Sequence, residues 1–519
     1  MAFLETSLDD KSKWLNNTLE RAQSHLTACL EGHERCRSQA ATKLPTRVID
    51  VGPADGSKHP FLYISNDQVE PNERTARSNA PAGPQGKADE HVRDQVETLQ
   101  KSTSATQSET GEEFKYTTLS YCWGKSQNFI TTLDNLKSMK EIIPWDKLPL
   151  TIQDAILITR GLGMRYIWVD ALCIIQDSPS DWTAESAKMA EIYGGSFLTI
   201  SAALGPDVHH GLMQDWTPNG IPRLPTPFAL GKDPLYSRAW ALQERMLSPR
   251  VLIFGSEELY WECYNSHTHG ILFKKLSDKP SPSDWHTVIR DYTCRNLTDE
   301  KDKLPALTGL ASVYGQATGK DYIYGLWKQT LIVDLLWSQR WLVVGNIAII
   351  DPPESYRAPS WSWASVNGNC MYFIPNTDIK LRTKILATFP DSSQSGSETT
   401  TEGDEWLLLH GPLIRAEAKQ GKIKFGSKGY AAVWMDLRDI DELDGIGRTT
   451  TSLETWNSNV SRADTWCLLL GYDNLQSYGL VLVEAVDFGE GNYRRVGTFI
   501  GFNWQDSFGS CGDSDLLLI

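Results

Sequence analysis

Between residues 114 and 204 the chain alternates short apolar runs with amphipathic segments, and this alternation constrains the fold more than any other feature. The apolar runs are FKYTTLSYCWG at 114–124, RYIWVDALCI at 165–174 and SFLTISAAL at 196–204. The middle run is apolar on both faces, as expected of a strand at the centre of a parallel sheet. The order strand, helix, strand, helix, strand predicts an α/β fold with an open parallel sheet.

The segments between these runs read as helices. In TIQDAILITRGLG, Thr151 and Asp154 fit a capping box, and apolar residues recur at helical spacing until a pair of glycines ends the pattern. DWTAESAKMAEIY, at 181–193, predicts a second helix capped at Asp181. RVLIFGSEELYWEC, which comes later, predicts a β-hairpin.

Residues 1–65 form a lead-in to this region. We expect a helix over residues 10–40, then two strands in LPTRVIDVG and PFLYI that make a small sheet. In the helix, CLEGHERC places Cys29, His33 and Cys36 on one face. Structural zinc normally takes four ligands, so we favour a packed helix face over a metal site and predict no bound metal.

The rest of the chain divides by composition. Residues 66–113 have almost no large apolar side chains and predict a disordered insertion. The apolar spacing in LPALTGLASVYGQ and GLWKQTLIVDLLW indicates helices, whereas later short runs alternate with turn residues as in a β-sandwich or barrel. We therefore assign an α/β domain to 114–265, a helical extension to 266–345, a β-rich segment to 346–390, a linker to 391–405 and a β-rich region to 406–519.

Charge and cysteine content exclude some classes of protein. The formal net charge of −15 argues against general nucleic-acid binding, which depends on Lys and Arg neutralising phosphates. The nine scattered cysteines indicate reduced thiols rather than a disulfide scaffold, so we expect a cytoplasmic protein. We also expect no signal peptide and no membrane span, because long apolar runs are missing.

The octapeptide WALQERML, at 240–247, carries the carboxylate of greatest interest. Trp240 and Glu244 are four residues apart, so they share one face of a helix. A carboxylate held against apolar neighbours has a raised pKa, a common mark of functional acids. The structural alternative is that Glu244 pairs with one of three nearby cations. These are Arg238, Arg245 and Arg250.

Open α/β sheets bind ligands in the crevice beyond the carboxyl ends of their strands. The residues that follow the first two strands should line it. They are Ser120, Tyr121, Trp123 and Gly124 after the first, and Asp170, Cys173, Gln176 and Asp177 after the second.

These residues also have structural interpretations. Trp123 and Gly124 can form a tight turn, Asp170 can cap a helix or pair with Arg160 or Arg165, and Cys173 fits a buried apolar position better than a nucleophile. The sequence has no GxGxxG or GxxxxGK[ST] loop, which argues against a Rossmann dehydrogenase and a P-loop nucleotide hydrolase.

Four segments, in this order, resemble the heterokaryon incompatibility (HET) domain of fungi. They are KYTTLSYCWG, LPLTIQDAILITRGLGMRYIWVDALCIIQDS, DWTAESAKMAEIYGGSFLTISAA and SRAWALQERMLSPRVLIF. The resemblance implies a role in non-self recognition, in which HET-domain proteins trigger growth arrest and cell death when incompatible strains fuse.

HET domains are also regarded as distant relatives of TIR domains, some of which cleave NAD. The resemblance therefore implies a TIR-like, flavodoxin-like α/β sheet. The catalytic TIR helix resembles S-x-W-C-x-x-E-L, and Ser237, Trp240 and Glu244 keep its spacing, whereas Ala241 and Arg245 replace the cysteine and leucine. On this basis Glu244 is the catalytic candidate, Trp240 stacks on the ligand, NAD is a substrate, and no cofactor is permanently bound.

Two other functions remain open. In one, the HET domain is a non-enzymatic adaptor that signals as a homo-oligomer or by docking an unidentified protein partner, a role that an acidic chain with nineteen tryptophans also suits. In the other, the fold has been recruited to different chemistry, such as a tailoring step in a biosynthetic pathway.

Overall fold

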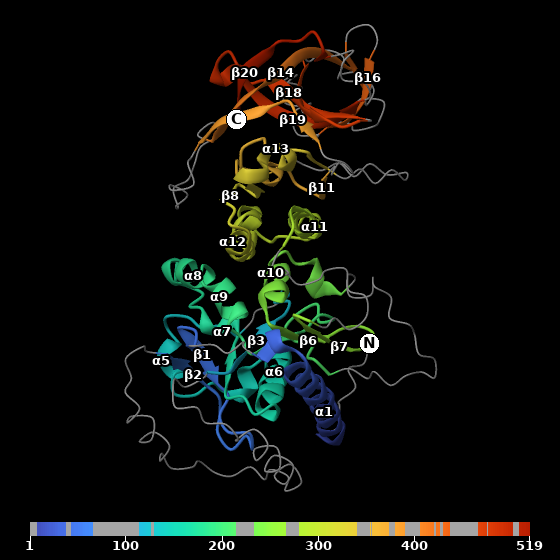
Figure 1. The fold of residues 1–519 in the computed structure, drawn as a ribbon. Helices are drawn as coiled ribbons and strands as arrows, with labels where there is room; N and C mark the ends of the chain where they lie inside the picture. The colour runs from blue at the N-terminus through green and yellow to red at the C-terminus, as the bar shows by residue number, and fades with distance from the viewer. Residues whose placement is uncertain are drawn as a thin grey trace. The chain divides into compact units, whose positions relative to one another are not determined.

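The computed structural model shows two compact units, residues 1–277 and 278–519 (Figure 1). The residues that the structure describes are 8–37, 43–65, 114–125, 129–213, 233–265, 280–339, 353, 355–372, 379–389, 405–419, 422–425, 429–435, 465–474, 476–501 and 508–519. The expected insertion at 66–113 and most of the expected linker at 391–405 lie outside these residues.

Seven strands of the first unit form one sheet in the order β2-β1-β4-β3-β5-β6-β7. The strands are short, and apart from β2 most of their residues are buried. The bounds are β1 Arg47–Asp50, β2 Phe61–Ile64, β3 Tyr116–Ser120, β4 Tyr166–Trp168, β5 Leu198–Ser201, β6 Arg250–Phe254 and β7 Leu259–Cys263.

The sheet is mixed: its centre is parallel, as predicted, and its outer strands are antiparallel. Strands β4, β3, β5 and β6 are parallel, whereas β1 pairs antiparallel with β4 and β7 pairs antiparallel with β6. The two lead-in strands therefore extend the main sheet, and the prediction of a separate small sheet was wrong. Their polarity and edge position depend on pairing with β4, which lies more than a hundred residues later and leaves no local sequence signal.

Helices cover both faces of this sheet. Successive strand residues point to opposite faces. Thr117 of β3 contacts Thr159 of helix α6 (Leu150–Gly161), whereas Ser120 of the same strand contacts Glu244 of helix α10 (Trp240–Leu247). Helices α6 and α10 therefore lie on opposite faces. Helix α1 (Leu8–Gly32) packs closely against α6. The Leu19 side chain of α1 lies so near Gly161 of α6 that a Cβ at Gly161 would collide with it.

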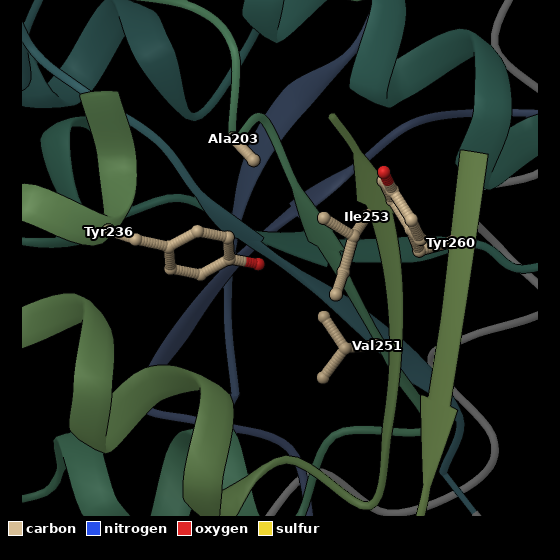
Figure 2. Packing of buried hydrophobic residues seen from close by; sticks show 5 residues of the cluster. All are labelled: Ala203, Tyr236, Val251, Ile253 and Tyr260. Carbon is tan, nitrogen blue, oxygen red and sulfur yellow. The ribbon is translucent and has the colours of Figure 1, made fainter. Parts of the chain in front are cut away.

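A small apolar cluster lies between the sheet and the segment that leads into α10. Val251 and Ile253 of β6 and Tyr260 of β7 are almost completely buried and point to the same side (Figure 2). The ring of Tyr236, which precedes α10, lies over this surface. Burying such side chains contributes about 1.5–3 kcal/mol each, so the cluster anchors the approach to α10 on the sheet.

Helix α6 begins differently from the prediction. Its N-cap is Pro149, and no side chain caps it. The hydroxyl of Thr151 accepts from the Gly211 amide (3.0 Å) and the Asp154 carboxylate accepts from the Leu212 amide (2.9 Å). Both side chains of the expected capping box are therefore used to hold the loop that follows β5.

The predicted helix at 181–193 is two helices, α8 (Pro179–Ser186) and α9 (Met189–Gly194). Ser178 is the N-cap of α8, where it accepts from the Asp181 amide (3.3 Å). The Asp181 carboxylate instead pairs with Arg47 at 2.6 Å. The prediction of Asp181 as the cap was therefore wrong, because an ion pair with a distant strand takes that carboxylate.

The second unit begins with helices packed around tryptophans. Helices α11 (Pro282–Tyr292) and α12 (Pro305–Thr318) confirm part of the expected helical extension. GLWKQTLIVDLLW instead forms short pieces, β9 (Leu326–Trp327), α13 (Leu331–Asp334) and β10 (Trp337–Gln339). Fully buried tryptophans of this unit are Trp285, Trp327, Trp337, Trp361 and Trp363. These indoles are core side chains and do not form a docking surface.

Gly325 fixes the geometry of this aromatic core. Its carbonyl accepts from the indoles of Trp285 (3.1 Å) and Trp363 (3.0 Å). Its φ of +90° is one that other residues adopt rarely, and a Cβ there would collide with Trp363. A single glycine therefore lets two tryptophans share one acceptor.

The C-terminal strands close on themselves. Strands β14, β17, β18, β19, β16 and β15 pair in a ring that returns to β14, and β20 pairs with β14 and β19. This agrees with the sandwich or barrel expected for 406–519. The bounds are β14 Trp406–Lys419, β15 Lys422–Phe425, β16 Gly429–Met435, β17 Thr465–Tyr472, β18 Ser477–Glu484, β19 Asn492–Gly501 and β20 Asp513–Leu518.

The segment expected to be β-rich, 346–390, has β11 (Cys370–Tyr372), β12 (Lys380–Leu381) and β13 (Lys384–Phe389). Among the described residues, no helix has both the length and the apolar character that crossing a bilayer requires.

Candidate functional site

Helix α10 carries Glu244 to the carboxyl end of β3. The helix spans Trp240–Leu247, which is the whole octapeptide WALQERML. Glu244 is only 7% exposed, and its Oε2 accepts a hydrogen bond from the hydroxyl of Ser120, the last residue of β3. Ser120 is the register partner of Ser201 at the end of β5. The carboxylate therefore lies where two neighbouring parallel strands end.

This position is also the point where the connections of the sheet diverge. From β3 the chain moves to β4 on one side, and from β4 it returns to β5 on the other side of β3. In doubly wound sheets, ligands bind at such a switch point, beyond the carboxyl ends of the strands. Ser120 and Glu244 lie at that point.

Burial raises the pKa of Glu244 from its ordinary value of 4.5 to about 7. Removal from water is the largest cause, because it disfavours the charged form. The charge of Arg238 and the hydrogen bond from Ser120 lower the pKa but do not cancel the effect of burial, and the nearby charge of Asp170 raises it. Near neutral pH this carboxyl group can both accept and release a proton.

The three arginines considered as partners for Glu244 have different roles. Arg245 forms a buried pair with Glu262 of β7, with a distance of 2.8 Å between Nε and Oε2. Arg250 donates to the carbonyls of Phe197 and Cys36. Arg238 donates to the Tyr121 carbonyl, and its charge acts on Glu244 and Asp170. Only Arg238 therefore belongs to the surroundings of Glu244.

Asp170 is the first residue of the short helix α7 (Asp170–Cys173), which follows β4 directly. The predicted strand was longer, but β4 ends at Trp168. Oδ2 of Asp170 accepts from the indole of Trp123 at 2.8 Å, so the segments after β3 and β4 are joined. Burial raises the pKa of Asp170, opposed by the charge of Arg238. Two carboxyl groups with raised pKa values thus share one cation.

Neither structural alternative for Asp170 applies through the predicted arginines. Arg165 pairs with Asp50 of β1 (2.9 Å), and Arg160 donates to the carbonyls of Val51 and Lys58. Both cations hold the lead-in strands to the sheet. Asp170 instead accepts from the Trp123 indole through Oδ2 and from the Ala171 amide (2.7 Å) through Oδ1, while the N-cap of α7 is Val169.

Tyr121 adds an unsatisfied polar group. Its side chain is 3% exposed, and its hydroxyl lies near the Asp170 carboxylate without making a hydrogen bond of ordinary geometry to the described residues. Burial and the charge of Asp170 raise its pKa well above 10, so the hydroxyl stays protonated. A buried hydroxyl without a well-formed hydrogen bond is costly and indicates a place for a bound polar group.

The backbone at Gly124 has a conformation that the turn predicted for Trp123 and Gly124 would use. Gly124 has φ +78°, and a Cβ there would collide with Asp207. The turn nevertheless aims the Trp123 indole at Asp170, so the two interpretations are compatible.

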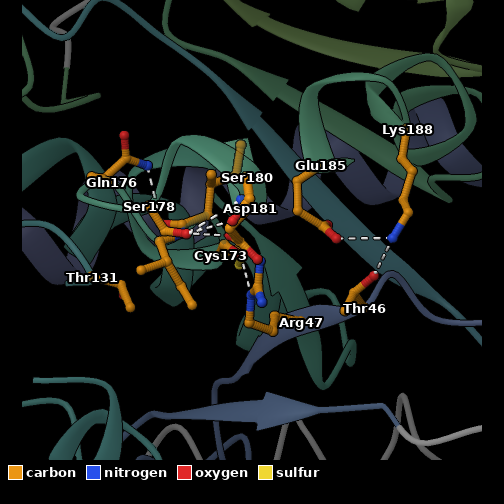
Figure 3. Close-up of polar contacts among 12 residues, drawn as sticks. Thr46, Arg47, Thr131, Cys173, Gln176, Ser178, Ser180, Asp181, Glu185 and Lys188 are labelled. Carbon is orange, nitrogen blue, oxygen red and sulfur yellow. Dashed lines mark hydrogen bonds and ion pairs between the residues drawn. The ribbon is translucent and has the colours of Figure 1, made fainter. Parts of the chain in front are cut away.

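Three other predicted residues have structural roles. Cys173 is completely buried, burial raises its pKa to about 12, and its carbonyl accepts from Arg47 (2.6 Å; Figure 3). The Gln176 amide donates to the carbonyls of Asp170 and Ile174. Asp177 is exposed and accepts from the Leu133 amide (2.9 Å). We interpret these three side chains as supports of the loop after α7, because no hydrogen bond of the described residues joins them to Glu244.

Two residues near Glu244 were not among the predicted site residues. Tyr193 of α9 is buried, donates to the Leu119 carbonyl (3.2 Å), and also lowers the pKa of Glu244 through its hydroxyl. Arg238 was considered only as an ion-pair partner. Trp240 begins α10 and is half-buried. No local pattern marks Tyr193, because its position in the site depends on how α9 packs against α10.

The arrangement can bind a polar ligand and stabilise positive charge. Glu244 and Asp170 supply carboxylates, Ser120 and Tyr121 supply hydroxyls, and Arg238 balances part of the negative charge. A carboxylate with a pKa near 7 is suited to accept a proton from water at neutral pH.

Comparison with known proteins identifies one family. Residues 116–226 match the model of the family described as heterokaryon incompatibility protein (HET), and no curated protein and no solved structure matches the chain. The matched segment contains β3, β4, β5 and the helices between them, so it includes Ser120, Tyr121 and Asp170. The resemblance drawn from the sequence is confirmed over residues 116–226, whereas helix α10 and Glu244 lie beyond the matched segment. The match supports a function related to heterokaryon incompatibility.

Proposed function

We propose, from the premise that this chain carries a HET domain, that it acts in heterokaryon incompatibility by hydrolysing NAD, with Glu244 as the catalytic residue. The observation that carries the proposal is the buried Glu244 carboxyl group, bound to Ser120 where two parallel strands end, with a pKa of about 7. Functional acids are often buried groups of this kind.

The chemistry of NAD makes one such carboxylate sufficient in principle. The bond that breaks joins C1′ of the ribose to the nitrogen of nicotinamide, and the nicotinamide takes the electron pair and leaves as a neutral molecule. A positively charged, oxocarbenium-like ribose is left. The leaving group is already cationic before cleavage, so it needs no proton. The protein has only to stabilise the positive charge that develops on the ribose, and a carboxylate beside the ribose can do so.

The second half of the reaction consumes water. Water attacks C1′ and loses a proton to Glu244, which later releases it to solvent, so the products are ADP-ribose, nicotinamide and a proton. Asp170 and the neighbouring hydroxyl of Tyr121 are suited to hold ribose hydroxyls. Trp240, half-buried at the start of α10, is suited to stack on an aromatic ring of the dinucleotide.

The test is release of nicotinamide from NAD by the purified full-length chain, compared with Glu244→Gln. We expect the substitution to lower the rate at least about a hundredfold, because a positioned acid–base group contributes about 10²–10⁴. The active form is the carboxylate, so the wild-type rate should rise with pH and level off above about 7. The assay should cover a range of protein concentrations, so that activity dependent on self-association is seen.

Glu141→Gln is the matched control, because Glu141 is an exposed glutamate of the same unit with no described side-chain partner. It should keep the wild-type rate. If the wild-type chain releases no nicotinamide at any protein concentration, the proposal that it hydrolyses NAD is overturned. Growth arrest on expression that is equally strong in Glu244→Gln favours the adaptor that acts by self-association or docking.

A further inference from the structure

Four metal-ligating side chains converge at the β7 edge of the first unit, and none of them belongs to the proposed active site. They come from the end of α1 (Cys29), the junction after it (His33), the short helix α2 (Glu34–Arg37, Cys36) and the end of β7 (Cys263). One ligand atom from each lies within 4.8 Å of all the others. The three thiols are buried and the imidazole is half-buried. The local sequence motif contained three ligands, and Cys263 is the fourth.

The backbone brings the first three together. Helix α1 ends at Gly32, where the His33 amide still donates to the Cys29 carbonyl (3.1 Å). The chain then restarts as α2, in which the Cys36 amide donates to the His33 carbonyl (3.1 Å). Offsets of four and three residues thus place all three side chains on one side of the helix end.

The fourth ligand arrives because α1 and β7 run in register. Arg21 donates to the Leu259 carbonyl and His25 stacks on Trp261, with ring centroids 5.8 Å apart. Four helix residues advance about 6 Å, and two strand residues advance about 6.6 Å. The next step along both elements therefore brings Cys29 level with Cys263.

We propose that Cys29, His33, Cys36 and Cys263 bind one zinc ion and thereby clamp the N-terminal helix to the edge of the sheet. Three thiolates and one imidazole form a complete tetrahedral set of the type that zinc takes in structural sites. Nδ1 of His33 lies 3.3 Å from the Cys263 sulfur and 3.9 Å from the Cys36 sulfur. Ligand atoms of a tetrahedral zinc are separated by roughly this distance, since each is about 2.0–2.3 Å from the ion.

Arg250 supports the charge of such a site. Zinc with three thiolates and a neutral imidazole carries a net charge of −1, which needs compensation when buried. Arg250 is fully buried, is the register partner of Cys263 and donates to the Cys36 carbonyl. Among the residues that the structure describes, no carboxylate pairs with Arg250. A buried cation next to the thiols is the expected complement of an anionic metal site.

The test is the zinc content of the full-length chain purified under reducing conditions without chelator. We expect one zinc ion per chain, released when a mercurial reagent titrates the thiols. After the zinc is exchanged for cobalt, the visible spectrum should show tetrahedral coordination with thiolate-to-metal charge transfer. Removing zinc with a chelator should lower the melting temperature of the first unit.

Variants locate the site. Cys263→Ser and Cys36→Ser should each lose most of the zinc, whereas Cys467→Ser, which changes a buried cysteine of the second unit, should keep it. A substitution at a buried cysteine can also unfold the first unit. The zinc content and the cobalt spectrum of the wild type therefore test the proposal without relying on the variants. Wild-type protein that neither contains zinc nor takes up cobalt overturns the proposal. So does an unchanged zinc content in folded Cys263→Ser. A disulfide within the cluster, detected by mass spectrometry of the freshly purified chain, also contradicts it.

Discussion

Replacing Arg245 with methionine should lower the free energy of unfolding of the first unit by about 3–5 kcal/mol. Arg245 and Glu262 form a pair in which the side chains are only 9% and 2% exposed. The substitution leaves the Glu262 carboxylate buried without its cation, which is far more costly than losing an exposed pair. The change in the free energy of unfolding is measured by chemical denaturation of the full-length chain. The unfolding transition that shifts on substitution is the one to follow.

Two further variants make this result interpretable. Lys43→Met breaks a pair with Glu191 whose side chains are both more than 60% exposed, so the loss should be about 1 kcal/mol or less. The double variant Arg245→Met/Glu262→Leu removes both charges and should recover most of the stability lost in the single variant. If Arg245→Met costs no more than Lys43→Met, the pair is not buried as described.

This pair also matters for the position of Glu244. Glu262 and Trp261 are successive residues of β7, so they point to opposite faces of the sheet. Arg245 is bound on the face that α10 covers, and it directly follows Glu244 in sequence. The Arg245–Glu262 pair therefore holds α10 to the sheet edge while the neighbouring carboxylate reaches β3.

Glu244→Gln should stabilise the first unit by about 3 kcal/mol at pH 8 and by little at pH 5. The folded-state pKa of about 7 lies above the ordinary value of 4.5, and each pKa unit corresponds to about 1.4 kcal/mol. Between these two pKa values the folded state binds the extra proton, so rising pH destabilises the wild type. Glutamine resembles the protonated acid and does not titrate, so it avoids this cost.

The measurement is the difference in unfolding free energy between Glu244→Gln and wild type at pH 5, 6, 7 and 8. Groups that titrate in both proteins cancel in this difference, so the remaining slope belongs to Glu244. Glu141→Gln, on the surface of the same unit, should follow the wild-type curve at each pH. A constant difference from pH 5 to pH 8 would mean that Glu244 keeps its ordinary pKa.

These two predictions do not depend on NAD. A stabilising Glu244→Gln that also loses nicotinamide release would show that the folded chain tolerates a costly buried acid because the reaction needs it. A stabilising substitution in a chain that never released nicotinamide would leave the acid as a structural feature of the first unit.

Much of the local structure could be predicted from the sequence. The bounds of α10 follow from the spacing of Trp240, Glu244 and Leu247 and from the proline that comes after them. The strands β3 and β5 follow from short buried apolar runs, and the hairpin of β6 and β7 follows from two such runs around a turn. These features depend on neighbours within a few residues, so their signals are local.

Predictions failed or stayed incomplete where the role of a residue or strand depends on a partner that is distant in the sequence. Thr151 and Asp154 form a plausible capping box, yet both bind the loop at Gly211 and Leu212, because tertiary contacts outweigh a local cap. The lead-in strands join the main sheet because β1 pairs with β4. Asp170 follows the strand β4 as the first residue of α7, and its binding of Trp123 depends on the ends of β3 and β4 lying side by side.

The sequence by itself determined that Trp240 and Glu244 share a helix and that Cys29, His33 and Cys36 share one helical face. Periodicity alone fixes such relations. The tertiary structure decided that Ser120, 124 residues earlier, binds the acid, that Arg238 rather than Arg245 or Arg250 lies beside it, and that Cys263 completes the thiol cluster. Strand order and side-chain direction set these contacts, and both arise only when the whole sheet assembles.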